Sequence, residues 1–143
     1  LVAAGEVERA KEMLGRAFAV VGAVGQGDRR GRELGWPTAN LAVDNELFPS
    51  DGVYVTEAWL ENETEGRASV TNVGTRPTFG HGVERHIEAH LLDFAGDLYD
   101  KRIELRFCRR LRGERRFESP EELIAQIERD VLAAREYFSA CAC

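Results

Sequence analysis

Apolar and polar residues alternate along much of the middle of the chain, which is the pattern of β-strands that place one face against a core. The clearest case is the run 52–60, in which Val53, Val55 and Trp59 fall on one face. The other face of this run carries Tyr54, Thr56, Ala58 and Leu60. Similar runs predict further strands over residues 16–24, 38–43, 67–73, 83–94 and 99–110. Because most connections between them are short, we expect an antiparallel sheet that curls into a small barrel.

Helical spacing of apolar residues marks the two ends of the chain. Residues 2–14 repeat apolar positions at helical intervals, and Gly15 is placed as a C-terminal cap. Near the other end, Ser119, Pro120 and Glu122 form the start of a capped helix that we expect to run to about Phe138. Its expected buried stripe is Leu123, Ile124, Ile127, Val131 and Phe138.

A glycine-rich stretch from Gly22 to Asn40 lies between two of the predicted strands. Its five glycines let the backbone turn N–H groups toward an anion, and its three arginines add positive charge that suits phosphate. Thr38 and Asn40 alternate along an extended segment, so their side-chain oxygens face one side and suit a hard cation such as Mg²⁺. No Gly-Lys-Ser/Thr follows, and the next element reads as a strand, so the stretch is neither a Walker A loop nor a Rossmann fingerprint. It predicts a phosphate-and-metal loop on a β scaffold.

A second candidate site is the segment His86–His90, where alternation places Ile87 and Ala89 on the core face and His86, Glu88 and His90 on the other. Three interpretations stay open. The three side chains could ligate a transition metal, although alternate residues are about 6.6 Å apart along a strand and another strand would have to help. Glu88 could act as a general base beside the phosphate loop. Spacing alone favours the third interpretation, a solvated strand face.

Composition narrows the functional classes. The chain has 143 residues, 43% of them hydrophobic, and a formal net charge of -6, which suits one globular domain and argues against general nucleic-acid or membrane binding. A basic stretch at 106–116 lacks interleaved aromatic residues, so a solvated edge or phosphate support is favoured over a nucleic-acid patch. Three cysteines without a framework spacing, no signal peptide and no long apolar run predict a cytoplasmic protein.

Several motifs, in order, resemble the riboflavin kinase domain of bacterial bifunctional riboflavin kinase/FMN adenylyltransferases. The first is the glycine-rich stretch, which ends in Pro37-Thr38-Ala39-Asn40. Gly52-Val53-Tyr54, the run from Asn72 to Phe79 and the run from Glu88 to Phe94 follow in the family's order, and Asp97-Leu98-Tyr99 closes the set. The resemblance covers almost the whole chain, and the ordered set is more specific than any one motif.

The resemblance implies a fold and a reaction. The fold is a six-stranded antiparallel Greek-key β-barrel with a C-terminal helix, formed by residues 16–143, and residues 1–15 are a linker helix from a preceding adenylyltransferase domain. The reaction is the transfer of the ATP γ-phosphate to the ribityl 5′-hydroxyl of riboflavin, which gives FMN and ADP. Neither nucleic acid nor membrane takes part.

The resemblance also implies roles for particular residues. Glu88 is the catalytic base, and Thr38 and Asn40 contact Mg²⁺ and the nucleotide phosphates. Asn72 and Arg112 contact the flavin, with the segments 72–79 and 109–116 as loops around it. The glycine loop from Gly22 to Gly31 covers the nucleotide. The full set of expected nucleotide-binding residues is Gly22, Val24, Gly27, Gly31, Arg32, Pro37, Thr38, Asn40 and Tyr99.

Two other functional classes remain open. A non-catalytic flavin- or nucleotide-binding module on the same barrel would have no need of a base, so the presence of Glu88 favours the enzyme. An interaction domain with an RNA-binding basic edge would bind RNA in a salt-sensitive way and would not turn over riboflavin.

Overall fold

The structure is a computed structural model that describes residues 6–25, 38–43, 49–61, 63–77, 83–92, 101–113 and 118–140. Its fold is mainly β and antiparallel with a C-terminal helix, as predicted. The elements in chain order are α1 (Val7–Leu14), β1 (Phe18–Gly25), β2 (Thr38–Val43), β3 (Gly52–Leu60), β4 (Arg67–Pro77), β5 (Val83–Leu91), β6 (Arg102–Arg112) and α3 (Pro120–Ala140).

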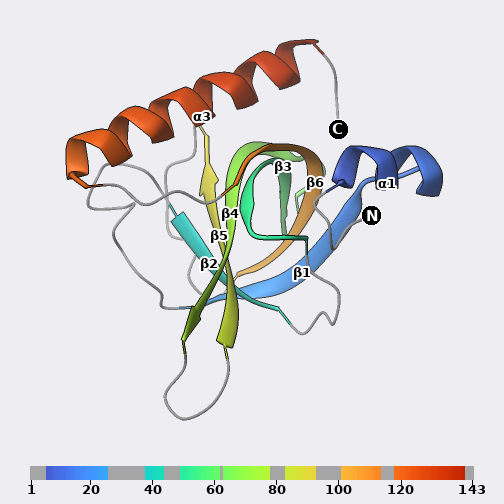
Figure 1. Cartoon of the computed structure of the whole chain (residues 1–143). Helices are drawn as coiled ribbons and strands as arrows, with labels where there is room; N and C mark the ends of the chain where they lie inside the picture. Colours follow the sequence, from blue (N-terminus) through green and yellow to red (C-terminus); the bar gives the residue numbers. More distant parts are fainter. Residues whose placement is uncertain are drawn as a thin grey trace.

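The strands form a closed barrel in the order β1-β2-β5-β4-β3-β6 (Figure 1). All neighbouring strands are antiparallel. Strands β3, β4 and β5 follow one another as a meander, whereas β2 pairs with β5 and β6 closes the ring between β1 and β3. The β4–β5 hairpin extends away from α3, beyond the opposite end of the barrel (Figure 1).

Alternation along the strands fills the barrel with side chains from one face of each strand. Tyr54 and Phe107 are fully buried there with their rings edge to face, 5.3 Å apart between centroids. The interior also encloses three hydroxyl groups, because Thr56 Oγ1 lies 2.6 Å from Ser69 Oγ and 2.7 Å from Thr71 Oγ1. Ser69 Oγ also donates to the carbonyl oxygen of Thr56. These polar groups are buried at little cost because each has a partner.

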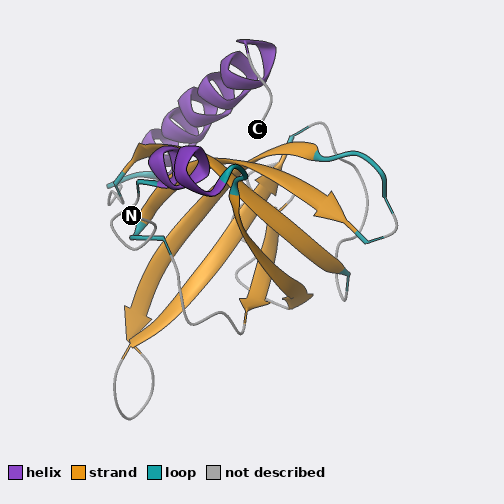
Figure 2. Cartoon of the chain, turned by 90° about the vertical axis from the view of Figure 1, so that its right-hand side faces the viewer, coloured by secondary structure: helices purple, strands orange, loops and turns teal. Residues whose placement is uncertain are grey.

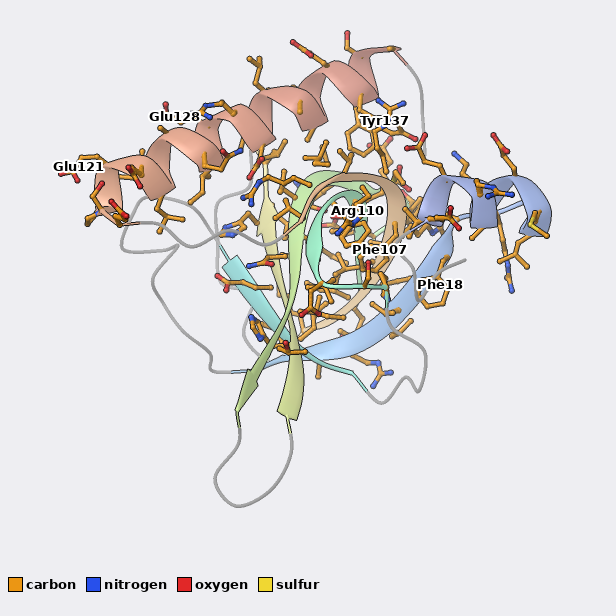
Figure 3. The ribbon with its side chains drawn as sticks, viewed as in Figure 1. Phe18, Phe107, Arg110, Glu121, Glu128 and Tyr137 are labelled. Atoms are coloured by element: carbon orange, nitrogen blue, oxygen red, sulfur yellow. The ribbon has the colours of Figure 1, made fainter. Side chains whose placement is uncertain are left out.

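Helix α3 covers the outer face of β3 and β4 and makes a second core there. Val53 and Val55, which alternation placed on the face opposite Tyr54, pack under Val131, Ala134 and Tyr137 of this helix. Glu121 and Glu128 project from the side of α3 that faces away from the barrel, whereas Tyr137 points toward the barrel (Figure 3). Strand β3 is therefore buried on both faces.

The start of α3 follows the predicted capping chemistry. Ser119 Oγ accepts a hydrogen bond from the backbone N–H of Glu122, and the Glu122 carboxylate accepts one from the N–H of Glu118. The buried stripe differs from the prediction in part. Val131 is buried as expected, but the other fully buried positions are Gln126, Asp130, Ala134 and Tyr137.

Helix α1 packs against β6 and β1 near the end of the barrel that α3 also occupies (Figure 2). Val7 and Ala10 are buried, and Val7 belongs to the same cluster as the barrel interior. The helix ends at Gly15, whose φ of 75° is the left-handed conformation predicted for a C-terminal glycine cap.

Several observed boundaries differ from the predicted ones. β1 runs to Gly25, one residue beyond the predicted strand 16–24, so the first part of the glycine-rich stretch is strand and pairs with β2 over Asn40–Val43. Gly74–Pro77 extends β4, because it pairs with Val83–His86 of β5. The expected loop at 109–116 begins later, since β6 continues to Arg112. Residues 26–37, 78–82, 93–100 and 114–117 lie outside the described parts of the chain.

Candidate functional site

The strand registers bring the predicted site residues into one row of paired positions that runs across the sheet. Asn40 pairs with both Gly25 of β1 and Glu88 of β5. Glu88 pairs in turn with Asn72 of β4, Asn72 with Val53 of β3, and Val53 with Arg112 of β6. The central row therefore crosses every strand of the barrel: it consists of Gly25, Asn40, Glu88, Asn72, Val53 and Arg112. Residues that are tens of positions apart in the sequence are thus neighbours on adjacent strands.

The central row lies on the outer face of the sheet. Val73 and Ile87, which are one residue further along β4 and β5, belong to the barrel interior. Alternation then directs Glu88 and Asn72 outward, on the face where Val53 meets α3. The expected base, an expected flavin contact and the covering helix consequently share one face.

The segment His86–His90 is not a solvated strand face, so the interpretation favoured by spacing alone was wrong. The side chains of His90 and Glu88 are only 14% and 16% exposed, and His90 Nε2 lies 4.0 Å from Glu88 Oε1. Burial lowers the pKa of His90 to about 4, although the negative charge of Asp130 opposes this change. His90 is therefore neutral at pH 7.

Polar atoms without a partner gather on β4 and β5. Among the described residues, Asn72 Oδ1, His86 Nδ1 and His90 Nδ1 are buried and have no hydrogen-bond partner. The three residues come from positions that are close in the β4–β5 register. Buried polar atoms in folded proteins are nearly always satisfied, so this group fits a site that receives a ligand, an ion or water.

Arg112 ends the central row and is fixed by α3. Its Nε lies 3.2 Å from Asp130 Oδ1 and its Nη2 lies 2.9 Å from Asp130 Oδ2, which is a bidentate ion pair. Gln126 Nε2 donates to the same carboxylate at 3.0 Å. Asp130 and Gln126 were not among the predicted site residues, because the apolar pattern of the helix does not include them. Their spacing of four residues, continued by Ala134, was the signal that they share a face.

The structure does not bring every predicted residue to the site. Val24 is 4% exposed and belongs to the barrel interior, so its side chain faces the core. Gly22 is buried within β1. The backbone of Thr38 pairs with His90, two residues along β2 from the pair that Asn40 makes with Glu88. The remaining expected nucleotide-binding residues, which are Gly27, Gly31, Arg32, Pro37 and Tyr99, lie outside the described residues.

The described residues do not support a transition-metal centre. They contain no group of three or more His, Cys, Asp and Glu side chains that could hold a metal ion. This argues against the His86-Glu88-His90 interpretation as a metal site.

No helix of the described segments combines the length and apolar character needed to cross a lipid bilayer.

Comparison with known proteins identifies relatives over nearly the whole chain. The chain is 44% identical over 129 residues to the bifunctional riboflavin kinase/FMN adenylyltransferase of Escherichia coli K12, which covers 90% of this chain and 41% of that protein. The chain thus spans about two fifths of the length of the curated relative.

Two solved structures are similar. A Streptococcus pneumoniae structure described as a macrolide-efflux protein has a TM-score of 0.89 and 31% identity, over 95% of this chain and 44% of that one. Riboflavin kinase from Trypanosoma brucei has a TM-score of 0.63 and 22% identity, over 85% of this chain and 79% of that one. At this identity the comparison shows a similar fold and nothing more.

The family comparison agrees with the motifs found in the sequence. The model of the riboflavin kinase family matches residues 14–138, a span that contains every strand of the barrel and nearly all of α3. The chain therefore belongs to the riboflavin kinase family.

Proposed function

We propose that this chain transfers the γ-phosphate of ATP to the ribityl 5′-hydroxyl of riboflavin and releases FMN and ADP. The observation that carries the proposal is the central row, because it sets Glu88 between Asn40 and Asn72 in the strand register. Membership of the riboflavin kinase family and the name of the Escherichia coli relative support the same reaction.

In this proposal Glu88 is the general base. Phosphoryl transfer depends chiefly on positioning and on charge stabilisation, and one carboxylate that accepts the proton of the attacking hydroxyl is sufficient base chemistry. Glu88 is mostly shielded from solvent and lies on a strand that is paired on both sides, so its position is held by the sheet. Asn72 on one side and Arg112 at the end of the row are the proposed flavin contacts.

Thr38 and Asn40 are the proposed ligands of Mg²⁺, with Glu88 in the adjacent register position. Their oxygen donors fit the preference of this cation. When bound, the metal ion would neutralise charge on the nucleotide phosphates. We also propose that Gly22, Val24, Gly27, Gly31, Arg32, Pro37 and Tyr99 lie along the nucleotide, with Val24 contributing through its backbone.

The finer description of the fold belongs to the same proposal. We interpret the strand order β1-β2-β5-β4-β3-β6 as a six-stranded Greek-key barrel, since β2 pairs with β5 across the β3–β4–β5 meander. We further propose that residues 1–15 connect the barrel to an adenylyltransferase domain, because the Escherichia coli relative is bifunctional.

The experiment is incubation of the protein with riboflavin, ATP and Mg²⁺, with FMN measured by chromatography. Wild-type protein should form FMN, and Glu88→Gln should lose at least about a hundredfold in kcat, as expected when general-base catalysis is removed. Glu128→Gln changes the same charge on the outer side of α3 and should keep wild-type turnover. Riboflavin binding without FMN formation by wild type would favour the non-catalytic binding module, and normal turnover of Glu88→Gln would remove Glu88 from the role of base.

A further inference from the structure

The Arg112–Asp130 pair connects the covering helix to the proposed flavin end of the central row. Asp130 is 6% exposed, and its carboxylate accepts bonds from Nε and Nη2 of Arg112 and from Gln126. Arg112 places its positive charge directly against the Asp130 carboxylate, with Nη2 2.9 Å from Oδ2.

The geometry of this pair limits what Arg112 can bind. An arginine grips a phosphate best with two parallel N–H groups along one edge of the guanidinium. In Arg112 the Nε–Nη2 edge is already occupied by Asp130, and Nη1 donates to the carbonyl oxygen of Gly113 at 3.1 Å. A phosphate that used the occupied edge would have to displace a buried carboxylate and leave it without a cation, which is unfavourable.

We propose that Asp130 is a positioning residue that fixes the orientation of Arg112 as a hydrogen-bond donor to an uncharged ligand group, namely the ring system of riboflavin. This inference rests on the proposed function and adds a role for α3. The helix covers the outer face of β3 and β4, and it also sets the orientation of a substrate contact on β6. Gln126 supports the same carboxylate from one turn away.

The test separates the two substrates. Asp130→Asn should raise KM for riboflavin roughly tenfold, because Arg112 is displaced from its bound orientation. KM for ATP should change less than about twofold, since Arg112 does not hold phosphate in this proposal. Binding of riboflavin, followed by quenching of flavin fluorescence, should weaken by the same factor as KM rises. Glu128→Gln on the outer side of α3 is the matched control and should leave both KM values unchanged.

A double-mutant cycle distinguishes positioning from loss of structure. Arg112→Gln with Asp130→Asn removes both buried charges, so it should fold even if Asp130→Asn alone does not. Its riboflavin affinity should match that of Arg112→Gln alone, because Asp130 acts through Arg112. Additive losses would overturn the inference, as would equal increases of both KM values in Asp130→Asn. If wild type forms FMN while Asp130→Asn keeps a normal KM for riboflavin, the inference fails and the proposed function stands. If wild type neither binds riboflavin nor forms FMN, both fail.

Discussion

Burial of polar side chains on the outer face of β5 and β4 is what separates the site from an ordinary strand surface. Alternation correctly predicted that Ile87 and Ala89 face the core. It could not predict that Glu88 and His90 are shielded as well, because the exposure of the outer face depends on tertiary contacts that strand alternation does not describe. The residue types were readable from the sequence, whereas their solvent exposure required the tertiary structure.

The buried state of His90 predicts a loss of stability in mild acid. Its pKa is about 4 in the folded protein, below the value near 6.5 of an unfolded chain, because burial disfavours the charged imidazole. As pH falls below about 6.5, the unfolded state binds a proton that the folded state does not bind. The free energy of unfolding should therefore drop, by about 2 kcal/mol between pH 7 and pH 5.

Urea unfolding at pH 7, 6 and 5 measures this change. The His90→Asn variant has no imidazole at this position, so its free energy of unfolding should fall less than that of wild type over the same interval. Carboxylates that titrate near pH 5 are shared by both proteins and cancel in the difference. Parallel curves for wild type and variant would show that His90 does not titrate in this way.

At the scale of the element, the helix termini and most strands were predictable from local chemistry. The Ser119 cap and the left-handed Gly15 are local features, and both are found where the sequence indicated. The end of β4 at Gly74–Pro77 was missed because glycine and proline suggested a loop, while its partner strand β5 keeps this segment extended. Pairing with a distant strand overrides local propensity.

Gly52, at the start of β3, lies where the neighbouring strand β6 leaves no room for a side chain. A Cβ at this position would lie 2.6 Å from the carbonyl oxygen of Arg112, and the φ of Gly52 is 157°. Backbone of β6 therefore blocks a side chain here, at the end of the central row. Gly52→Ala should destabilise the protein by roughly 2 kcal/mol through strain. Because the backbone of Arg112 must move, KM for riboflavin should rise as well.

Gly113→Ala provides the control, since a Cβ there would meet its nearest atom, Arg110 Nη2, at an ordinary 3.6 Å. Its free energy of unfolding should stay within about 0.5 kcal/mol of wild type. Thermal or urea unfolding of both variants measures the difference. If Gly52→Ala proved as stable as Gly113→Ala, the close approach of β3 and β6 at this point would not be a constraint on the fold.

On the scale of the whole molecule, β6 joins both helices to the barrel. Arg109 lies 3.3 Å from Glu8 of α1 through its Nε, and its guanidinium lies 5.1 Å from the ring centroid of Tyr137 in α3. Arg112, three residues later, pairs with Asp130. The sequence indicated a basic edge here, but it could not indicate that these arginines lie between elements from the two ends of the chain. Local sequence patterns do not reveal the closed strand order either, because that order depends on which distant strands pair.

The burial of α1 leads to a prediction about the extent of the folded unit. A helix that served only as a linker would contribute little to the stability of the barrel. Val7 is 1% exposed and belongs to the core cluster of the barrel, whereas Met13 on the same helix is 74% exposed. Val7→Ala should therefore lower the free energy of unfolding by about 2 kcal/mol, through lost burial and the cavity left behind.

Met13→Ala is the matched control on the exposed side of α1, and its effect should stay within about 0.5 kcal/mol. Both values come from urea unfolding at one pH, followed by a probe of the barrel such as the fluorescence of Trp59. The difference between the two variants is the informative quantity, because both shorten a side chain to alanine in the same helix, one on its buried side and one on its exposed side. A large difference would show that the barrel and α1 unfold together, so that the cooperative unit begins before residue 16. Equal and small effects would instead favour a linker that rests on the barrel without stabilising it.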